Sequence, residues 1–553
     1  MRRAIAFILL VAATATFSTA QSPTTRATTP GALVAAASSA RASSTPLASP
    51  GHDKCGTWLG IAIRDHAAEF SLKERLTVEA FLAPPALQKS RVIGHFRIHY
   101  DTTGFNAASM LDVNELPLPG TSEAYVDSVG AVFNAVLDAE VSMLGYASPI
   151  APGDIYNIYC SDIGFYGLTQ TTDRIGTTTP PRFSSFIEID NDFRGFYSAG
   201  LQGLRVTAAH EFHHAIQFAG YGFWNGMEYL MEITSTWMED VVYDDVNDFV
   251  QYLRDPYVPT PIARGQFAAP ELSFTATNGL IEYSRCIWGK YLERRHSRDL
   301  MRSIWEAIRS SPPLDAMDQA LLAAGSSFRE AFLEWSGWNS RTWGSADTVH
   351  GYRESASFPP VRIRATYDYA SPSRSYPDSI NALSSGYHLV NVAGHTMLAI
   401  ISNLDRTLPA GPQRFRYEIQ DASESSFKRL SNGVSVRVAA AVPANWASQE
   451  DVPSIVPEVV VYPNPFLVGR SPHISFRLPV TTASTTVSLV VLTAGLDAVF
   501  SGSLPVLQPR PLEQNVAWNA RDDRGRSLSS GVYLFALKVD GNEYTGKFSV
   551  IGE

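Results

Sequence analysis

Cysteine is scarce in this chain, which has only Cys55, Cys160 and Cys286 among its 553 residues. Such a small, odd number allows at most one internal disulfide, so disulfides cannot be the scaffold of an exported protein of this size. Hydrophobic residues make up 45% of the chain, which is enough to bury several cores, and the length favours about three domains. We therefore expect hydrophobic burial to hold the fold together.

Positive charge is also in short supply. The chain has 44 Lys and Arg against 54 Asp and Glu, a formal charge of −10, and no basic tract offsets that sign. Because nucleic acids are polyanions, we expect no nucleic-acid partner. An acidic surface is compatible with Ca²⁺, and Asp190-Asn191-Asp192 offers oxygen ligands, but the run lacks the spacing of a known calcium loop. We predict a turn there.

Long apolar runs are missing after the N-terminus. Residues 1–20 carry Arg2 and Arg3, an apolar run, and small residues before Gln21, which together predict a signal peptide. No later segment approaches the ~20 continuous apolar residues of a membrane-spanning helix. We therefore expect a secreted protein, extracellular or at the cell surface, with no membrane span after signal cleavage. Residues 21–51 are mostly Ala, Ser, Thr and Pro and are predicted to be a disordered lead or pro-segment with no fold of its own.

The strongest chemical signal is His210-Glu211-Phe212-His213-His214. H-E-x-x-H on a helix places the outer histidines one turn apart on one face, where both imidazoles can bind one zinc ion. Glu211 lies beside that face, where its carboxylate can accept a proton from a metal-activated water. Apolar residues at helical spacing predict that the helix is buried: Leu204, Ala208, Phe212, Ala215 and Ala219. We predict His210 and His214 as ligands and Glu211 as the catalytic base. His213 lies off the ligand face and is predicted to be a packing or hydrogen-bonded residue.

A catalytic zinc site needs a third protein ligand and keeps a fourth position open. The three-histidine extension of the motif does not apply, because Gln217 and Gly220 stand where it requires a glycine and a histidine. A second helical segment, Met227 to Val242, follows. Polar residues, three of them acidic, recur in it at three- and four-residue spacing on one face: Glu228, Glu232, Thr236 and Glu239. We select Glu232 as the third ligand and expect Glu228 and Glu239, taken singly, to lie on a solvated helix face.

With these residues the chain resembles the gluzincin class of zinc metallopeptidases, whose third ligand is a Glu on a helix after the H-E-x-x-H helix. The run from Glu232 to Asp240 also resembles the E-x-x-x-x-W-x-E-D stretch of secreted bacterial metalloproteases of this type. The resemblance implies that Glu239 and Asp240 support the site or the structure. It also implies a downstream donor for the developing oxyanion. Tyr283, in the helical-looking segment Ile281 to Leu292, is the candidate, although a tyrosine on an amphipathic helix is also a common core residue.

The gluzincin resemblance covers roughly Cys55 to Trp338 and implies an α+β unit, a mixed sheet with a helical lobe, which we place at 52–347. Short β-rich runs precede the zinc helix: Gly94 to Tyr100, Ile155 to Tyr159 and Phe183 to Ile189. A helix is expected from Ser122 to Leu144. We interpret the Phe183 to Ile189 strand as the sheet edge on which an extended peptide substrate pairs. Helical patterns after the site form the second lobe: Arg298 to Ile308, Leu314 to Ala323 and Phe328 to Trp338.

Alternating β segments beyond about Thr348 predict a β-sandwich domain at 348–455. The last unit, 456–553, contains three short motifs: Tyr462-Pro463-Asn464-Pro465-Phe466, a W-x-x-x-D-x-x-G run from Trp518 to Gly525, and Ser530-Gly531-Val532-Tyr533. These resemble the immunoglobulin-like C-terminal domains shared by flagellar hook-capping proteins and the sorting tails of bacterial type IX secretion cargo. The resemblance implies a second sandwich and secretion machinery as a partner. An adhesive or spacer sandwich without an export role fits equally well.

The sequence therefore predicts a secreted zinc-dependent endopeptidase, acting on protein or peptide substrates, followed by two β-sandwich domains. The alternative is a surface adhesin or binding protein with a structural or vestigial metal site, and a third hypothesis is a zinc hydrolase of non-peptide esters or amides. The number of protein ligands separates the first two, because a structural zinc site closes with four protein ligands, whereas a catalytic one keeps a position open.

Overall fold

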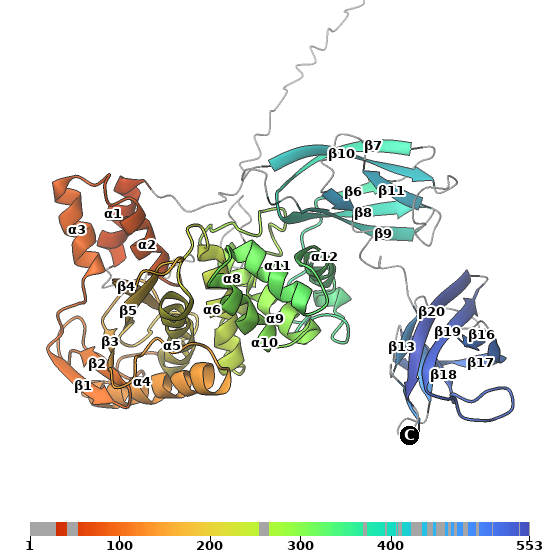
Figure 1. The fold of residues 1–553 in the computed structure, drawn as a ribbon, viewed down its shortest axis with the longest axis horizontal. Helices are drawn as coiled ribbons and strands as arrows, with labels where there is room; N and C mark the ends of the chain where they lie inside the picture. The colour runs from red at the N-terminus through yellow and green to blue at the C-terminus, as the bar shows by residue number, and fades with distance from the viewer. Residues whose placement is uncertain are drawn as a thin grey trace, which may run out of the picture.

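The computed structural model in Figure 1 describes residues 29–40, 54–253, 265–368, 373–392, 395–404, 406, 412–421, 434–438 and 446–448. It also describes 459–551 apart from gaps at 463–465, 469–472, 479–484, 494–496, 511–512 and 541. The fold is α+β with several sheets, including a half-barrel, which agrees with the predicted class. The predicted signal peptide lies outside the described residues.

A five-stranded sheet with the order β1-β2-β3-β5-β4 forms the framework of the site. Its strands are β1 (Lys89–Ile93), β2 (Phe96–Tyr100), β3 (Tyr156–Cys160), β4 (Gly167–Ile175) and β5 (Arg182–Ile189). Strands β2, β3 and β5 are parallel, whereas β4 runs antiparallel to β5 at the edge. The predicted edge is therefore wrong: Phe183 to Ile189 belongs to β5, which is hydrogen-bonded on both sides, and its last four residues are buried.

Helices pack beside this sheet and continue into a helical lobe (Figure 1). The helices beside the sheet are α4 (Ser122–Leu137), extended by a π-helix (Asp138–Met143), and α5 (Gly200–Ile216), extended by a π-helix (Gln217–Tyr221). The lobe contains α6 (Glu228–Val242), α7 (Val250–Leu253), α8 (Ile281–Ser284), α9 (Cys286–Arg295), α10 (Asp299–Ile308), α11 (Pro313–Ala323), α12 (Phe328–Asn339) and a 3₁₀ turn (Trp343–Ser345). The helices predicted from the sequence are confirmed, except that Ile281 to Leu292 is broken at Arg285.

Three N-terminal helices form a small separate unit above β4 and β5 in Figure 1: α1 (Pro30–Ala40), α2 (Thr57–Asp65) and α3 (Leu72–Leu82). They share a hydrophobic cluster, to which Leu33, Ile63 and Phe81 contribute and which Ile163, Phe165 and Leu168 complete. The prediction that 21–51 has no fold of its own is thus wrong for residues 30–40, because the small apolar residues of α1 find a partner surface on α2 and α3. The remainder of that segment lies outside the described residues.

The region after the helical lobe contains two sheets. One has the order β12-β9-β8-β6 and the other β11-β10-β7, built from β6 (Ala365–Asp368), β7 (Ser373–Asn381), β8 (Ser384–Val392), β9 (His395–Asn403), β10 (Pro412–Asp421), β11 (Val434–Val438) and β12 (Trp446–Ser448). The main hydrophobic core does not stop at the predicted boundary at 348, since Tyr352, Phe358 and Tyr387 belong to the same buried cluster as the sheet and the helical lobe.

The C-terminal unit has its own core, built entirely from residues between Val459 and Val550. One eight-stranded sheet forms it, from β13 (Val460–Tyr462), β14 (Phe466–Leu467), β15 (Ile474–Arg477), β16 (Thr486–Thr493), β17 (Ala498–Arg510), β18 (Glu513–Trp518), β19 (Gly531–Val539) and β20 (Asn542–Ile551). Strand β17 pairs with β16 through its first half and with β18 through its second. The strand order therefore passes at β17 from one group of strands to the other, which makes the two groups continuous.

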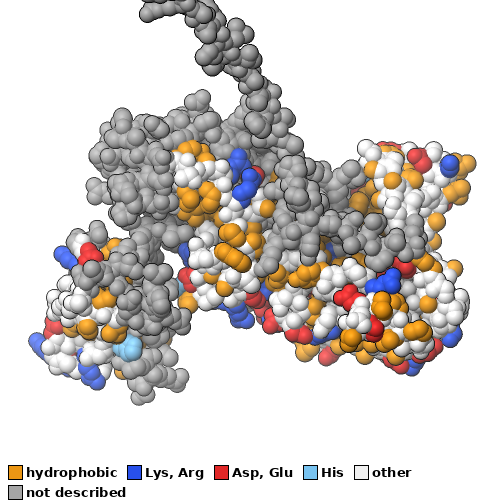
Figure 2. Space-filling model, turned by 180° about the vertical axis from the view of Figure 1, so that it is seen from behind, with side chains coloured by type: hydrophobic (Ala, Val, Ile, Leu, Met, Phe, Trp, Pro, Cys, Tyr) orange, Lys and Arg blue, Asp and Glu red, His pale blue; other side chains and the backbone are white. Residues whose placement is uncertain are grey.

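Within the part of the chain that the structure describes, none of the helices has the length and apolar character needed to cross a membrane. On the face of the molecule seen in Figure 2, basic and acidic side chains are interspersed among hydrophobic and neutral ones.

Candidate metal centre

Helix α5 carries the H-E-x-x-H motif through the middle of the main core. The predicted apolar stripe is buried along its whole length, from Leu204 to Ala219, and the helix packs against β4, β5, α4 and α6. His210 and His214 project from the same face, with ring centroids 4.8 Å apart. Their side chains are almost completely enclosed, so the helix presents both imidazoles in fixed positions, as the motif predicts.

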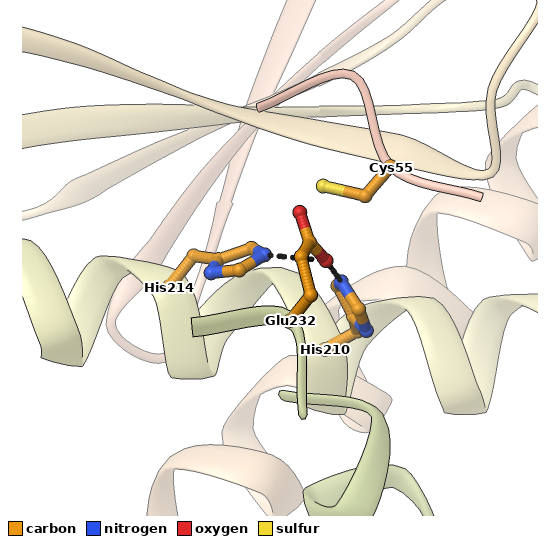
Figure 3. Close-up of side chains that lie close together, drawn as sticks. All are labelled: Cys55, His210, His214 and Glu232. Carbon is orange, nitrogen blue, oxygen red and sulfur yellow. Dashed lines mark hydrogen bonds and ion pairs between the residues drawn. The ribbon is translucent and has the colours of Figure 1, made fainter. Parts of the chain in front are cut away.

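Glu232, on α6, meets these two imidazoles. Its Oε2 lies 3.1 Å from Nε2 of His210 and 3.5 Å from Nε2 of His214. Figure 3 shows the carboxylate between the two rings. The structure therefore brings the three predicted ligands together, although they come from two helices.

A fourth side chain, which the sequence did not indicate, joins them: Cys55. Its Sγ and one ligand atom from each of His210, His214 and Glu232 all lie within 4.8 Å of one another, and all four residues are buried. Figure 3 shows the thiol reaching the Glu232 carboxylate from a segment on the opposite side of the site from the histidines. No spacing rule links an N-terminal cysteine to a helix this far along the chain, so only the tertiary fold reveals it.

His210 is oriented by Glu239, which lies two helical turns beyond Glu232 on α6. Nδ1 of His210 lies 2.7 Å from Oε1 of Glu239; a carboxylate accepts only, so Nδ1 carries the proton. Lys54 Nζ in turn lies 2.9 Å from Oε2 of Glu239 and 2.5 Å from Oδ2 of Asp248. Glu239 is buried and not on a solvated face, which corrects the expectation for this residue taken singly and agrees with a supporting role.

His214 is oriented by an amide. Nε2 of Gln217 donates to the carbonyl of Met231 at 3.2 Å, which turns Oε1 of Gln217 toward Nδ1 of His214 at 2.7 Å. Nδ1 therefore carries the proton, and Nε2 presents its lone pair to the cluster. This Nε2 is buried and makes no hydrogen bond to the residues that the structure describes. A buried lone pair of this kind needs a proton or a cation as its partner.

Burial and mutual contact shift the pKa values of the cluster's side chains. Burial lowers the pKa of His210, but hydrogen bonds to Glu232 and Glu239 outweigh it and raise that pKa to about 9. Burial would raise the pKa of Glu232, yet His214 and His210 hold it well below its usual range. Burial, with the charges of Glu211 and Glu232, raises the pKa of the Cys55 thiol well above its ordinary value. Left to themselves, the four side chains need positive charge, which His210 supplies as a proton.

A divalent cation fits this set of donors. With Nδ1 of each histidine occupied, both Nε2 atoms face Oε2 of Glu232. An Nε2 lone pair and a carboxylate oxygen this close repel unless a proton, as on His210 without metal, or a cation lies between them. Two imidazoles, a thiol and a carboxylate are the ligand types that Zn²⁺ takes in proteins. Cys55, His210, His214 and Glu232 could therefore hold one metal ion.

Glu211 lies next to the cluster but is held by hydroxyl groups. Its Oε2 accepts hydrogen bonds from Oγ1 of Thr169, at 2.7 Å, and Oγ1 of Thr57, at 3.3 Å. Thr169 belongs to the edge strand β4, and Thr57 is the first residue of α2. The predicted base is therefore positioned by the sheet on one side and by the N-terminal unit on the other.

Tyr283 also reaches the site. It lies on α8, is fully buried, and its ring is 6.3 Å from that of His210 and 5.3 Å from that of Tyr252. Cys55 contacts both tyrosines in one small cluster. The structure places the predicted residue beside the ligands, in surroundings that a packing role also explains.

Other predicted residues fall away from the cluster. His213 is buried and pairs through Nδ1 with Oε2 of Glu140 at 2.8 Å, which confirms a hydrogen-bonded histidine. Asp190 forms a turn, since its Oδ1 accepts from the backbone N–H of Asp192 at 3.0 Å, as predicted. The three cysteines are buried and unpaired, so none of them forms a disulfide.

No family model matches the chain, and no curated protein matches it. A similar solved structure is that of PorZ, described as an essential bacterial surface component of the type-IX secretion system of Porphyromonas gingivalis. It is 19% identical over 22% of this chain and 14% of that chain, with a TM-score of 0.14. This chain thus matches only a small part of that protein's length.

Proposed function

We propose that the chain is a secreted, zinc-dependent endopeptidase of the gluzincin type. The observation that carries the proposal is the convergence of His210, His214 and Glu232 next to Glu211 in a buried cluster. The order of these residues along two successive helices is that of the resemblance found in the sequence. Zinc, when bound there, would polarise a peptide carbonyl and acidify water.

The chain's own residues would supply the remaining roles. Glu239 and Gln217 hold the imidazole rings so that each Nε2 faces the metal position. Glu211 would take the proton from the attacking water and pass it to the leaving amine. Tyr283 would donate a hydrogen bond to the developing oxyanion. Strand β4, at the sheet edge beside Glu211, offers backbone groups for an extended substrate.

The test uses the metal-loaded chain carrying Cys55→Ala, because Cys55 lies where the substrate or water would bind. Glu211→Gln added to this chain keeps the shape of the side chain but removes the base. We expect cleavage of an unfolded protein to fall by about 10²–10⁴-fold while one metal per chain is retained. Glu228→Gln, one turn before Glu232 on α6, is the matched control and should change little. Equal cleavage with and without Glu211, or no cleavage at all by the metal-loaded chain, would refute the proposal.

One observation favours a second function. Four protein ligands are the mark of a structural zinc site, and Cys55 supplies the fourth. The chain would then be a surface binding protein whose metal only stabilises the fold. Binding of azide to a cobalt-substituted Cys55→Ala chain separates the two, because a site with three ligands and an open position takes up the anion, whereas a structural site that needs all four ligands loses its metal.

Export rests on the sequence alone. The N-terminal signal and the hook-capping and sorting-tail motifs support secretion, with secretion machinery recognising residues 456–553. We include these in the proposal as the route by which the enzyme reaches its protein or peptide substrates.

A further inference from the structure

The segment Lys54 to Thr57 lies along the edge strand of the sheet, across the candidate metal centre. The backbone N–H of Tyr166 donates to the carbonyl of Lys54 at 3.0 Å, and that of Gly56 donates to the carbonyl of Gly167 at 2.9 Å. Cys55 thereby pairs with Gly167 in a parallel bridge. The segment occupies the edge that an extended substrate would otherwise use.

Three side chains of this segment each engage a different part of the site. Lys54 pairs with Glu239, the carboxylate that orients His210. Cys55 brings its thiol to the metal ligands. Thr57 donates its hydroxyl to Glu211 and accepts the backbone N–H of Thr169 at 2.8 Å. A structural metal site requires only the thiol, so contact with the base and with the sheet edge points to occlusion of the whole site.

The segment belongs to the N-terminal unit, the three helices within residues 30–82, and not to the body of the molecule. That unit's hydrophobic cluster includes Ile163, Phe165 and Leu168 of the body, and Lys54, Thr57 and Arg64 add polar contacts with the body. Removing it would take away no buried residue of the main core, although Ile61 of α2 packs against that core from outside.

A connector, residues 83–88, joins the unit to β1. It has neither helix nor strand, and Ala83, Pro84 and Ala86 are exposed. Exposed, irregular segments with small residues are preferred sites of proteolytic cleavage. One cut there would separate the segment from the rest of the chain without breaking an element of the body.

We propose that residues 54–57 are a latch that keeps the enzyme latent. Cys55 binds the metal as its fourth protein ligand, and Thr57 holds the carboxylate of Glu211 in a hydrogen bond. The site opens when cleavage in the connector lets the N-terminal unit leave. This inference rests on the proposed endopeptidase function. The four buried side chains, with Nε2 of His210 and Nε2 of His214 both turned toward Oε2 of Glu232, carry the metal part of it, and the hydrogen bonds of Thr57 carry the rest.

The first experiment tests directly whether the Cys55 thiolate binds the metal. The full-length chain is loaded with Co²⁺, whose thiolate ligation gives a charge-transfer band in the near ultraviolet. We expect the band in wild type and in the matched control Cys286→Ala, a second buried cysteine outside the site. Cys55→Ala should lack the band, retain one cobalt per chain and bind added azide, which wild type should not. A wild-type chain that binds cobalt without the band overturns the proposal, and so does loss of the metal from Cys55→Ala.

The second experiment opens the latch. A recognition sequence for a specific protease is placed in residues 83–88 of the full-length chain, and the chain is cut after metal loading. We expect the thiolate band to disappear and the cleavage of unfolded protein to rise by about tenfold or more, since activity scales with the fraction of open sites. The same rise is expected for uncut Cys55→Ala.

The outcomes separate the two proposals. If the band disappears on cutting and azide binds, but no substrate is hydrolysed, the latch stands and the endopeptidase function fails. If the uncut wild-type chain is already as active as Cys55→Ala, the enzyme stands and the latch fails. A band that persists after the cut, with the N-terminal unit still attached, also contradicts the opening step.

Discussion

Two carboxylates meet His210 from opposite edges of its ring, and they serve different purposes. Glu239 lies 2.7 Å from Nδ1 and fixes the tautomer, whereas Glu232 lies 3.1 Å from Nε2 on the side where the metal would bind. Lys54 neutralises Glu239, so Glu239 does not compete with Glu232 for the metal. The arrangement makes Nε2 a better ligand because its ring is polarised by a charged acceptor.

The substitution Glu239→Gln tests this support at the residue scale. The amide keeps the volume but loses the charge that favours an Nδ1–H on His210. We expect the affinity for Zn²⁺ to fall by about 10–100-fold, the range found when such supporting partners are removed, as measured by competition with a chelator. Asp240→Asn, next on α6 and paired with Lys290, is the control and should leave the affinity unchanged. Unchanged binding by Glu239→Gln would mean that Glu239 only packs.

At the scale of elements, the sequence predicts the helices of the site better than its strands. Helices α5 and α6 carry periodic patterns that place His210, His214 and Glu232 within a turn or two. Strand β4 is different, because its first residues, Gly167 to Thr171, are mostly polar and yet buried. Thr169 can be buried because its hydroxyl donates a hydrogen bond to Glu211. The pattern of apolar and polar residues along the strand does not indicate such a partner.

Cys55 and Thr57 could not be predicted from the sequence for a related reason. A helix fixes the spacing of its ligands, whereas a segment that pairs with a distant strand has no fixed spacing at all. The neighbouring Ala, Ser, Thr and Pro composition also suggested disorder. The tertiary contacts of the N-terminal unit outweigh that local preference, as they do for α1.

The close approach of β4 to α5 gives a prediction at this scale. A Cβ at Gly167 would lie 2.8 Å from Cγ2 of Thr207 and 2.9 Å from Cγ of Glu211, so Gly167→Ala must push the strand away from the helix. We expect a loss of about 1–3 kcal/mol, seen by calorimetry in the transition that responds to chelation of the metal. Gly344→Ala, where a Cβ meets open space, should stay within about 0.5 kcal/mol of wild type. Equal melting of both variants would mean that β4 moves freely.

At the scale of the whole molecule, the chain divides where its cores divide. The main cluster runs from Phe96 to Ile400, and the last one from Val459 to Val550. The described part of 348–404 therefore contributes buried residues to the body that carries the candidate metal centre and is not an appendage to it. Tyr387 donates from its hydroxyl to the carbonyl of Ser336 on α12 at 2.8 Å, and Phe358 packs its ring 6.0 Å from that of Phe249.

Two truncations distinguish these connections. Deletion of 456–553 removes a complete core, so the remaining chain should keep its metal content and its chelation-sensitive melting transition. Deletion of 348–553 removes Tyr352, Phe358 and Tyr387 from the main core. Because losing one buried aromatic ring costs about 3–5 kcal/mol, three exceed or match a typical stability of about 5–15 kcal/mol, and this chain should fail to fold. A soluble, metal-binding chain ending at residue 347 would contradict the shared core, while a shifted transition after the shorter deletion would show that the C-terminal unit stabilises the metal centre from outside.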